Sequence, residues 1–471
     1  MNRKGTIENI LKSDPSAVVS GDFSAVSEIV ESSGQAKYGS LFVCLRGVQR
    51  DGHDYVRDAY NHGCRHFLCE HKLVLPSEVS YAIVKSVRIH LCRLMMDLYG
   101  VEKNEFTLIA VTGTKGKTTT AQLLSHILSR AGYPTACSTT LGLFDGEKWE
   151  QTSNTTPNLF TIVPWLSKLK QKGMRFVVIE VSSAALSGAR LYGMQFQLGI
   201  LTSFSKDHVG KGEHESMMEY LCAKRSLFSL YGISAAILPH GVMLGEHIVS
   251  DTPNIIHMKD DARTIAEREN GQNFSYKGRE AFLSLIGAHN RINACLALTA
   301  AAVLTGKRDV EFLPYLADAS IPGRYEQILH KGIHVVIDYA HNRESFTAVA
   351  RAAFGRSKGR LLCVFGSVGG RGEGRRTELA KVAGEWMDFS VITADDPGEE
   401  SVLGICAQIY AAFDDKTKAR IVTDRAAAIR YAFSLCRPGD TLLLLGKGHE
   451  RVQKMKGKSL PFSERSIVLS L

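Results

Sequence analysis

The sequence lacks long hydrophobic runs. Its longest apolar helix candidate, residues 294–304, is well short of the ~20 residues that a membrane-spanning helix needs. The N-terminal residues contain no apolar segment of the kind found in a secretory signal peptide. We therefore expect no membrane partner and a cytoplasmic location.

Paired cysteines are also absent. The ten cysteines stand singly between Cys44 and Cys436, and the closest two are Cys64 and Cys69. Zinc sites and disulfide frameworks of small secreted domains have closer and more regular spacings. The pattern predicts reduced thiols, most of them buried.

Basic residues are in excess but do not cluster. The formal net charge is +9, yet the nearest approach to a basic run is "KMKGK" at 454–458. Nucleic-acid-binding domains typically gather such residues in one patch. The excess fits a small polyanionic ligand equally well, and we expect no nucleic-acid partner.

The chain has no internal repeat, and its 471 residues suffice for about three domains at roughly 150 residues each. Short strands are expected up to residue 105. Apolar strands alternating with helices follow, which predicts parallel sheets, and a turn-rich segment near residue 322 precedes a new strand series. The predicted class is α/β, with domains 1–105, 106–321 and 322–471.

Several of the later apolar runs end in glycine, a carboxylate or histidine. Examples are "RFVVIE" at 175–180, "FSVITADD" at 389–396 and "TLLLLGKGHE" at 441–450. Ligands of open parallel sheets bind beyond the carboxyl ends of the strands. These ends are therefore candidate parts of a site.

The stretch "IAVTGTKGKTTTAQLL" at 109–124 predicts a strand, a glycine-containing turn and a helix. Backbone N–H groups in such a turn can hold a phosphate at the helix N-terminus. Lys117 would reach the terminal phosphates, and Thr118 or Thr119 would offer a hydroxyl to Mg²⁺. Val111 stands where a longer phosphate loop has its first glycine.

Other candidate residues have ordinary alternatives when taken alone. Glu180 and His208 at strand ends could ligate Mg²⁺ or lie on the surface. Lys224 could be a solvated helix residue, and Asn290 could cap a helix. The glycine- and arginine-rich segment 366–376 could clamp anions or be a solvated loop.

Taken in order, the motifs resemble the Mur ligase family, and within it the MurE type. The resemblance covers essentially the whole chain. The order of the motifs along the chain is more specific for the family than any single motif. The matching segments are "TGTKGKTT" (112–119), "SNTTP" (153–157), "EVSS" (180–183), "SKDH" (205–208), "CAKRSLF" (222–228), "GAHNRIN" (287–293), "PGRYE" (322–326), "DYAHN" (338–342) and "GKGHE" (446–450).

The resemblance implies an N-terminal uridine-nucleotide-binding α/β domain, a central P-loop-type ATPase domain with a mainly parallel sheet, and a C-terminal Rossmann-like domain. It implies an ATP- and Mg²⁺-dependent ligase of peptidoglycan synthesis. A carboxylate would be phosphorylated by ATP and then attacked by an amine. The expected substrates are UDP-MurNAc-L-Ala-D-Glu and an amino acid, and the expected state is a monomer.

Site residues are implied by position. The catalytic residues would be Lys117, Glu180, His208 and Lys224, with Thr118, Glu180, His208 and carbamylated Lys224 around the metal. ATP would contact Gly113, Thr114, Lys115, Gly116, Lys117, Thr118, Thr119, Asn290, Asn293, Arg324, Asp338 and His341. The UDP-sugar peptide would contact Ser33, Asn154, Thr155, Thr156, Ser182 and Arg190, and the amino acid Arg376, Asp395, Asp396, Gly446 and Glu450.

Four segments depart from the family pattern. Members that add meso-diaminopimelate typically carry DNPR where this chain has "DDPG" (395–398), so Gly398 replaces an arginine that would bind the distal carboxylate. An unpaired carboxylate is disfavoured, and we therefore expect L-lysine or L-ornithine as the added residue. "SSG" (32–34) replaces DSR, Ala184 replaces a histidine, and Gly370 replaces an acidic residue.

These departures leave alternatives open. The chain could be a meso-diaminopimelate-adding enzyme, or a MurE-like paralogue with another amino acid or acceptor. A folate or polyglutamate-type ligase is a further alternative, which the resemblance of residues 41–63 to a uridine-nucleotide domain disfavours. A nucleic-acid motor with a phosphate loop is another.

Overall fold

The computed structural model describes residues 6–47, 50–74, 76, 78–206, 210, 214–259, 261–268, 271–370 and 373–471. They belong to two compact units. The first unit comprises Met1–Lys117, Gly132–Phe204 and Leu221–His257, and the second comprises Thr118–Ala131, Ser205–Tyr220 and Met258–Leu471. Each unit is described by itself.

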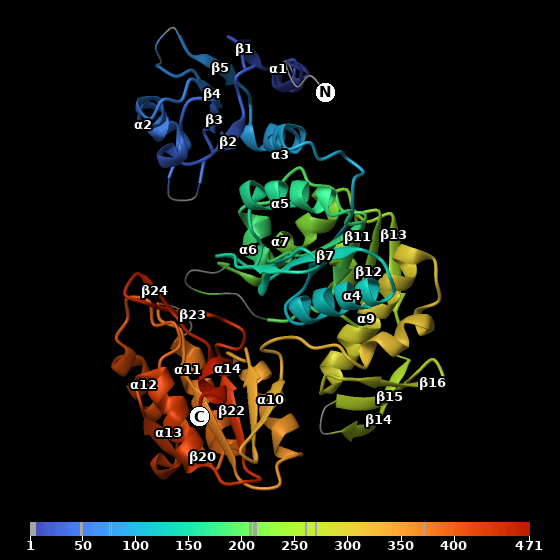
Figure 1. Ribbon diagram of the computed structural model, residues 1–471, viewed down its shortest axis with the longest axis vertical. Helices are drawn as coiled ribbons and strands as arrows, with labels where there is room; N and C mark the ends of the chain where they lie inside the picture. The colour runs from blue at the N-terminus through green and yellow to red at the C-terminus, as the bar shows by residue number, and fades with distance from the viewer. Residues whose placement is uncertain are drawn as a thin grey trace. The chain divides into compact units, whose positions relative to one another are not determined.

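The first unit begins with a five-stranded sheet in the order β1-β5-β4-β3-β2 (Figure 1). Neighbouring strands are parallel except β1, which is antiparallel to β5. Phe42 and Phe67 lie in its core with Cys44, Cys64 and Cys69. The elements are α1 (Thr6–Lys12), β1 (Val18–Ser20), β2 (Glu28–Val30), β3 (Ser40–Val43), α2 (Val56–Asn61), β4 (His66–Cys69), β5 (Ser80–Ile83) and α3 (Val87–Leu98).

An eight-stranded sheet follows, in the order β13-β12-β11-β6-β10-β7-β8-β9. Strands β12, β11, β6, β10 and β7 are parallel neighbours, and β8 and β9 add antiparallel strands at one edge. The middle strands are apolar and buried along their length, as expected where helices cover both faces. The strands are β6 (Thr107–Thr112), β7 (Thr135–Thr139), β8 (Gly142–Phe144), β9 (Trp149–Glu150), β10 (Phe176–Glu180), β11 (Leu198–Leu201), β12 (Ala235–Pro239) and β13 (Asn254–Met258).

The helices associated with these strands in the chain are α4 (Lys117–Arg130), α5 (Leu159–Gln171), α6 (Ser183–Ser187), α7 (Met217–Leu230) and α8 (Gly245–Val249). The division between the units runs through α4 after Lys117 and through α7 after Tyr220. The phosphate loop therefore belongs to the first unit and most of α4 to the second.

The second unit contains an antiparallel sheet, β14 (Ala262–Arg268), β15 (Gly271–Tyr276) and β16 (Arg279–Leu283), followed by α9 (Ala288–Thr305). It ends with a six-stranded sheet in the order β17-β18-β22-β19-β20-β21 (orange to red in Figure 1). β22, the last of these strands in sequence, lies between β18 and β19 and is parallel to both. Strand β17 is antiparallel to β18.

Two apolar layers cover the six-stranded sheet. One contains residues of α10, α11 and α12, and the other contains residues of α13 and α14. This is a doubly wound arrangement of parallel strands. The elements are β17 (Glu326–His330), β18 (Ile333–Asp338), α10 (Arg343–Phe354), β19 (Leu361–Phe365), α11 (Glu373–Trp386), β20 (Phe389–Ile392), α12 (Val402–Ala411), β21 (Ala419–Ile421), α13 (Arg425–Leu435), β22 (Thr441–Leu445), the β23–β24 hairpin (Val452–Met455, Lys458–Pro461) and α14 (Glu464–Leu469).

The α/β class and the mainly parallel central sheet are confirmed. Each of the three larger sheets falls within one expected segment, at 18–83, 107–258 and 326–445. The boundaries at 105 and 321 stay predictions. Most of the cysteines are buried, as expected; Cys222 is exposed and Cys436 is half-buried.

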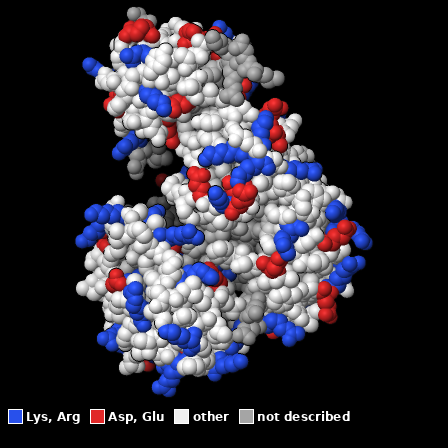
Figure 2. Space-filling model, in the orientation of Figure 1, with Lys and Arg blue, Asp and Glu red and all other residues white. Residues whose placement is uncertain are grey.

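Surface charge and hydropathy agree with the composition. In the part of the chain that the structure describes, no helix is long and apolar enough to cross a membrane. On the face drawn in Figure 2, Lys and Arg side chains form separate groups with Asp and Glu side chains among them.

Candidate active site

The phosphate loop follows β6 and is held against the segment that follows β11. Thr114 N donates to Ser203 O (2.9 Å), and Lys115 N donates to Ser203 Oγ (2.9 Å). A Cβ at Gly113 would lie 2.0 Å from Thr202 Oγ1, and φ there is +148°. Gly116 has φ +82°. The positive φ angles at both positions favour glycine. Val111 lies within β6, so the loop begins only after the strand ends at Thr112 and is correspondingly short.

Two lysines point at the same loop. Lys117 Nζ donates to Gly113 O (3.0 Å) and Thr114 O (3.1 Å). Lys224 Nζ, on α7, donates to Gly113 O (2.9 Å) and Thr112 Oγ1 (3.0 Å). Lys224 is fully buried, and desolvation lowers its pKa well below the usual value; the Lys117 charge lowers it further, and Glu180 opposes the shift. Burial and a neighbouring cation both favour the neutral amine.

Glu180 ends β10 and is buried. Its Oε2 accepts from Thr140 N (3.0 Å) and from Thr140 Oγ1 (3.2 Å), and Thr140 Oγ1 lies 3.3 Å from Thr155 Oγ1. Lys117, Glu180 and Lys224, three of the four expected catalytic residues, thus lie in one electrostatic neighbourhood. His208, the fourth, lies outside the described residues.

Three of the expected UDP-sugar-peptide residues, Thr156, Ser182 and Arg190, form a chain of contacts beside Glu180. Thr156 Oγ1 donates to Glu180 O (2.8 Å) and accepts from Ser182 N (3.0 Å). Arg190 Nη1 donates to Thr156 O (3.1 Å), and desolvation lowers the pKa of Arg190. Asn154 is exposed and its amide contacts the adjacent Ser153 Oγ (3.3 Å).

A pocket of about 470 Å³ lies in the same unit. Ser33 and Arg190 line it, and their contact with a substrate stays a prediction. Asn158 Nδ2 donates to Glu31 Oε1 (2.8 Å) in the pocket, where burial raises the pKa of Glu31. The remaining lining residues are Ser32, Leu45, Gly47, Arg50, Gly52, Tyr55, Arg88, Leu91, Leu159, Phe160, Gly188, Ala189 and Tyr192.

In the second unit, the hydroxyl-bearing face of α4 contacts α9 and Arg324. Arg324 Nη2 donates to Thr118 Oγ1 (3.3 Å). Thr120 Oγ1 donates to Asn293 Oδ1 (3.3 Å), and Asn293 Nδ2 donates to Asn290 Oδ1 (3.4 Å). Thr119 is buried in the same turn of α4. Thr118, Asn290, Asn293 and Arg324 are therefore brought into one neighbourhood.

Three motifs far apart in sequence meet beside β18. A Cβ at Gly323 would lie 2.2 Å from His449 N, and one at Gly448 would lie 2.9 Å from Tyr339 N. The Arg324 guanidinium lies over the Tyr339 ring at 4.9 Å. Only glycine allows backbones to approach so closely. The motifs "PGRYE", "DYAHN" and "GKGHE" therefore pack together in one cluster.

Asp338 and His341 are oriented by backbone groups of these three motifs. Asp338 accepts from Tyr325 N (2.6 Å) and Ala340 N (2.7 Å); burial raises its pKa and the Arg324 charge opposes the rise. His341 Nδ1 lies 2.8 Å from Tyr339 O.

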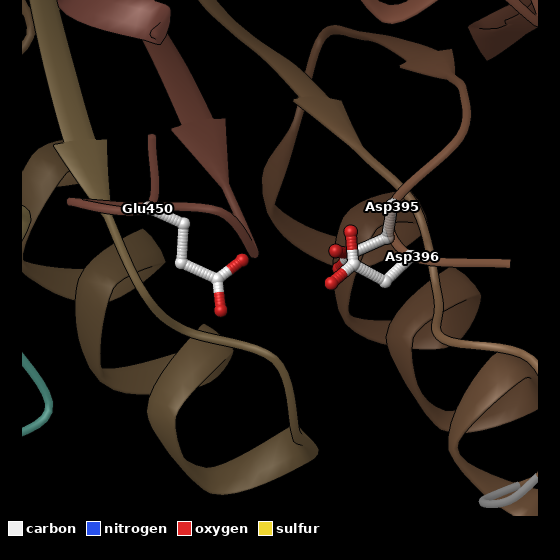
Figure 3. A group of neighbouring side chains, drawn as sticks. All are labelled: Asp395, Asp396 and Glu450. Carbon is white, nitrogen blue, oxygen red and sulfur yellow. The ribbon is translucent and has the colours of Figure 1, made fainter. Parts of the chain in front are cut away.

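Three carboxylates, Asp395, Asp396 and Glu450, gather beyond β20 and β22. Their closest oxygens lie within 4.8 Å of one another, and Figure 3 shows the Glu450 carboxylate facing the Asp396 carboxylate from another strand end. Buried Lys447 donates to Asp396 Oδ1 (2.7 Å) and contacts Glu450. Burial raises the pKa of Asp395 and of Glu450. A Cβ at Gly446 would lie 2.7 Å from Asp395 Oδ2.

Arg376 is buried and already holds a carboxylate. Its Nη1 donates to Glu400 Oε1 (2.7 Å) and Gln408 Oε1 (2.7 Å), and its Nη2 donates to Glu400 Oε2 (2.8 Å). This is a bidentate ion pair. At Gly398 φ is +59° and no atom lies within 4 Å of a Cβ built there.

Sequence reasoning missed several of these residues. Lys447 and Glu400 are charged partners of predicted residues, and Thr202 and Ser203 support the phosphate loop. Lys447 falls inside a recognised motif, so its position was a usable signal. Glu400, Thr202 and Ser203 have no local pattern that distinguishes them from surface residues.

Two family models match the chain: the Mur ligase middle domain over residues 111–301, and the Mur ligase glutamate ligase domain over residues 323–448. A UDP-N-acetylmuramoyl-L-alanyl-D-glutamate--2,6-diaminopimelate ligase of Aquifex aeolicus (strain VF5) is 32% identical over 457 residues, covering 94% of this chain and 93% of the relative. The ligase of the same name from Bacteroides thetaiotaomicron is 31% identical over 448 residues, covering 91% and 92%.

Solved structures share the fold. The structure of a UDP-N-acetylmuramoyl-L-alanyl-D-glutamate--2,6-diaminopimelate ligase superposes with a TM-score of 0.63 at 24% identity and covers 94% of each chain. MurF ligase from Thermotoga maritima, in complex with ADP, gives a TM-score of 0.61 at 18% identity and covers 90% of this chain and 95% of its own. With relatives above 30% identity over nearly its full length and both domain models matched in order, the chain belongs to the Mur ligase family, in its MurE type.

Proposed function

We propose that the chain is an ATP-dependent ligase that joins a diamino acid to the D-glutamate of UDP-MurNAc-L-Ala-D-Glu in peptidoglycan synthesis. The observation that carries the proposal is the fully buried Lys224 amine, 2.9 Å from Gly113 O in the phosphate loop. The curated MurE-type relatives carry the ligase name. The proposed segments are 1–105 for the UDP-sugar, 106–321 for ATP and 322–471 for the amino acid, in a cytoplasmic monomer.

The reaction has two steps. The acceptor carboxylate attacks the γ-phosphorus of ATP, which forms an acyl phosphate and releases ADP. The amine of the amino acid then attacks the acyl carbon, and the tetrahedral intermediate expels phosphate as the amide forms. Such chemistry depends on positioning and on neutralising charge. Lys117, held at Gly113 O and Thr114 O, would contact the transferred phosphoryl group.

Lys224 and Glu180 fit a magnesium site. Mg²⁺ prefers oxygen ligands, and a buried neutral lysine can react with CO₂ through its lone pair, release a proton and become a carbamate with two oxygens. The lowered pKa of Lys224 supplies that neutral amine. Glu180 and carbamylated Lys224 would supply oxygen ligands to the ion, and Mg²⁺ would neutralise phosphate charge. Thr118 and His208 stay the other expected ligands.

The added amino acid is a diamino acid in this proposal, because the Asp395, Asp396 and Glu450 carboxylates suit a distal ammonium. The relatives' names make 2,6-diaminopimelate the first candidate. Gly398 favours a second, L-lysine or L-ornithine, since no arginine at that turn meets a distal carboxylate. Arg376 is already paired with Glu400, which weighs the same way.

Product mass spectrometry tests the proposal. Purified protein would be given ATP, UDP-MurNAc-dipeptide and an equimolar mixture of meso-diaminopimelate, L-lysine and L-ornithine. We expect one tripeptide product that forms only when all substrates are present. ADP formation without any UDP-linked product would contradict ligase activity, and a single lysine or ornithine product would replace the first candidate by the second.

A further inference from the structure

A buried arginine lies beneath the three carboxylates of the six-stranded sheet. Arg425 begins α13, Glu464 begins α14, and neither side chain is exposed to solvent (0% each). Arg425 donates from Nε (3.0 Å) and Nη2 (2.8 Å) to one carboxylate oxygen, Glu464 Oε1. Charge-assisted bonds of this kind are strong and directional.

The other donors of Arg425 join two strands that are not neighbours. Nη1 donates to Ala394 O (3.0 Å), just beyond β20, and Nη2 donates to Leu445 O (2.7 Å), at the end of β22. Strand β19 lies between β20 and β22, and its last ladder pair is at Phe365. Where β19 stops connecting them, Arg425 does so.

The two carbonyl groups directly precede the acidic segments. Ala394 is followed by the Asp395–Asp396 turn, and Leu445 is followed by Gly446 and the segment that carries Glu450. The segments are close, because a Cβ at Gly446 would lie 2.7 Å from Asp395 Oδ2. A change in the spacing of the two strand ends would therefore separate the carboxylates seen in Figure 3.

Stability alone is a weak reason for this pair. Burying a guanidinium and a carboxylate costs solvation that apolar residues of similar size would not lose. Among the described residues, Glu464 Oε2 has no hydrogen-bond partner, which adds to that cost. What the rigid fork of an arginine does supply is fixed directions for its donors.

The same arginine also sets the charge of the site. Burial raises the pKa of Asp395, and the charges of Arg425 and Lys447 oppose the rise. Two cations are thus shared among four carboxylates, which favours a further cation, such as a substrate ammonium. The carboxylates are Asp395, Asp396, Glu450 and Glu464.

We infer that Arg425 and Glu464 are positioning residues of the amino-acid site, which clamp the ends of β20 and β22 and so set the distance between the Asp395–Asp396 turn and Glu450. The inference rests on the proposed function, in which these segments bind the incoming amino acid. The clamp acts through backbone carbonyls and need not touch the substrate.

Steady-state kinetics of the full-length protein tests the clamp. We expect Arg425→Met to raise KM for the amino acid about tenfold or more, with KM for ATP and for the UDP-dipeptide changed less than about twofold. Arg425→Lys should recover part of the loss because an ammonium still reaches one carbonyl group. Glu464→Gln, which keeps an acceptor oxygen, should be the mildest change.

The matched control is Arg465→Met, which removes a 57% exposed arginine of α14, next to Glu464 in the chain, together with its ion pair to Glu326. It should leave all three KM values unchanged. If Arg425→Met does not fold, the ratio of KM values in Arg425→Lys decides. A folded variant with unchanged amino-acid KM, or with all three KM values raised alike, would overturn the positioning role. Wild-type protein without amino-acid-dependent ATP turnover would overturn the proposed function and this inference together.

Discussion

Lys224 lies in an environment far from that of a free lysine in water. It is fully buried beside Lys117, and its pKa is lowered well below 10.5. A lysine in such a position loses solvation when charged. The side chain is therefore poised for reaction as an amine, and its charged form destabilises the fold.

Lys224→Met should raise the free energy of unfolding at neutral pH in CO₂-free buffer. In the wild type, burying Lys224 lowers the free energy of unfolding, because the folded chain binds fewer protons than the unfolded chain between the folded pKa of Lys224 and 10.5. This loss of stability is greatest at low pH and vanishes as pH rises towards 10.5. The gain in the variant should shrink accordingly in urea titrations at pH 7 and pH 10.

Bicarbonate provides the second arm of that measurement. Carbamylation removes the ammonium, so bicarbonate should stabilise the wild type and leave Lys224→Met unchanged. Lys168→Met, at a 66% exposed side chain, is the control and should show neither effect. A Lys224→Met protein that is less stable at every pH would contradict the desolvation argument.

Gly398 is the residue at which specificity should be most open to change. A Cβ there would meet no atom within 4 Å beyond the neighbouring residues, so a side chain has room to begin, but φ of +59° costs an L-residue about 1–2 kcal/mol. We expect Gly398→Arg to be slightly less stable and to raise kcat/KM for meso-diaminopimelate relative to L-lysine about tenfold.

Competition assays with both amino acids would measure this ratio. Gly398→Gln, which bears the same backbone strain without the charge, is the control. An equal shift in both variants would attribute the change to the backbone and not to a carboxylate contact.

At the scale of elements, the phosphate loop depends on how closely β6 and the end of β11 approach. A Cβ at Gly113 would lie 2.0 Å from Thr202 Oγ1, whereas a Cβ at Gly132, just after α4, would meet no atom within 4 Å beyond its neighbours. Both glycines have positive φ. Alanine substitutions at the two glycines therefore distinguish the effect of a steric clash from the effect of backbone strain.

Gly113→Ala should therefore abolish measurable ATP binding in calorimetry, because Thr202 and the loop backbone must move apart. Gly132→Ala should bind ATP within about twofold of wild type and lose only the strain energy, about 1–2 kcal/mol of stability. Similar ATP affinity in the two variants would show that the loop does not need the contact with Thr202.

The elements were predictable because their patterns are local. Apolar runs such as 176–179 and 442–445 predicted buried parallel strands, and the glycines of 113–116 predicted the turn. The partners of these elements were not predictable. That Arg425 reaches Leu445, or that Glu400 holds Arg376, follows from tertiary packing of segments that carry no signal of their neighbours. His208 stays a prediction.

At the scale of the molecule, the formal charge of +9 should act through the polyanionic substrates. We expect kcat/KM for the UDP-dipeptide to fall several-fold between about 0.1 M and about 1 M salt, as the Debye length shrinks from about 10 to about 3 Å.

Duplex DNA distinguishes this from nucleic-acid binding. ATP hydrolysis should not rise on adding DNA, and an equal concentration of uncharged polymer is the control. DNA-stimulated hydrolysis in the absence of the UDP-dipeptide would contradict a ligase and support a motor.

The place of β22 in its sheet has a consequence for synthesis of the chain. Strands β18 and β19 are made more than 75 residues before the strand that must lie between them, residues 441–445. Until the ribosome has delivered that strand, their facing edges have no partner, and unpaired edges are where nascent chains associate wrongly. A chain truncated before residue 441 should therefore have no functional C-terminal segment. Only an almost complete chain can close this sheet and bring Glu450 to Asp396.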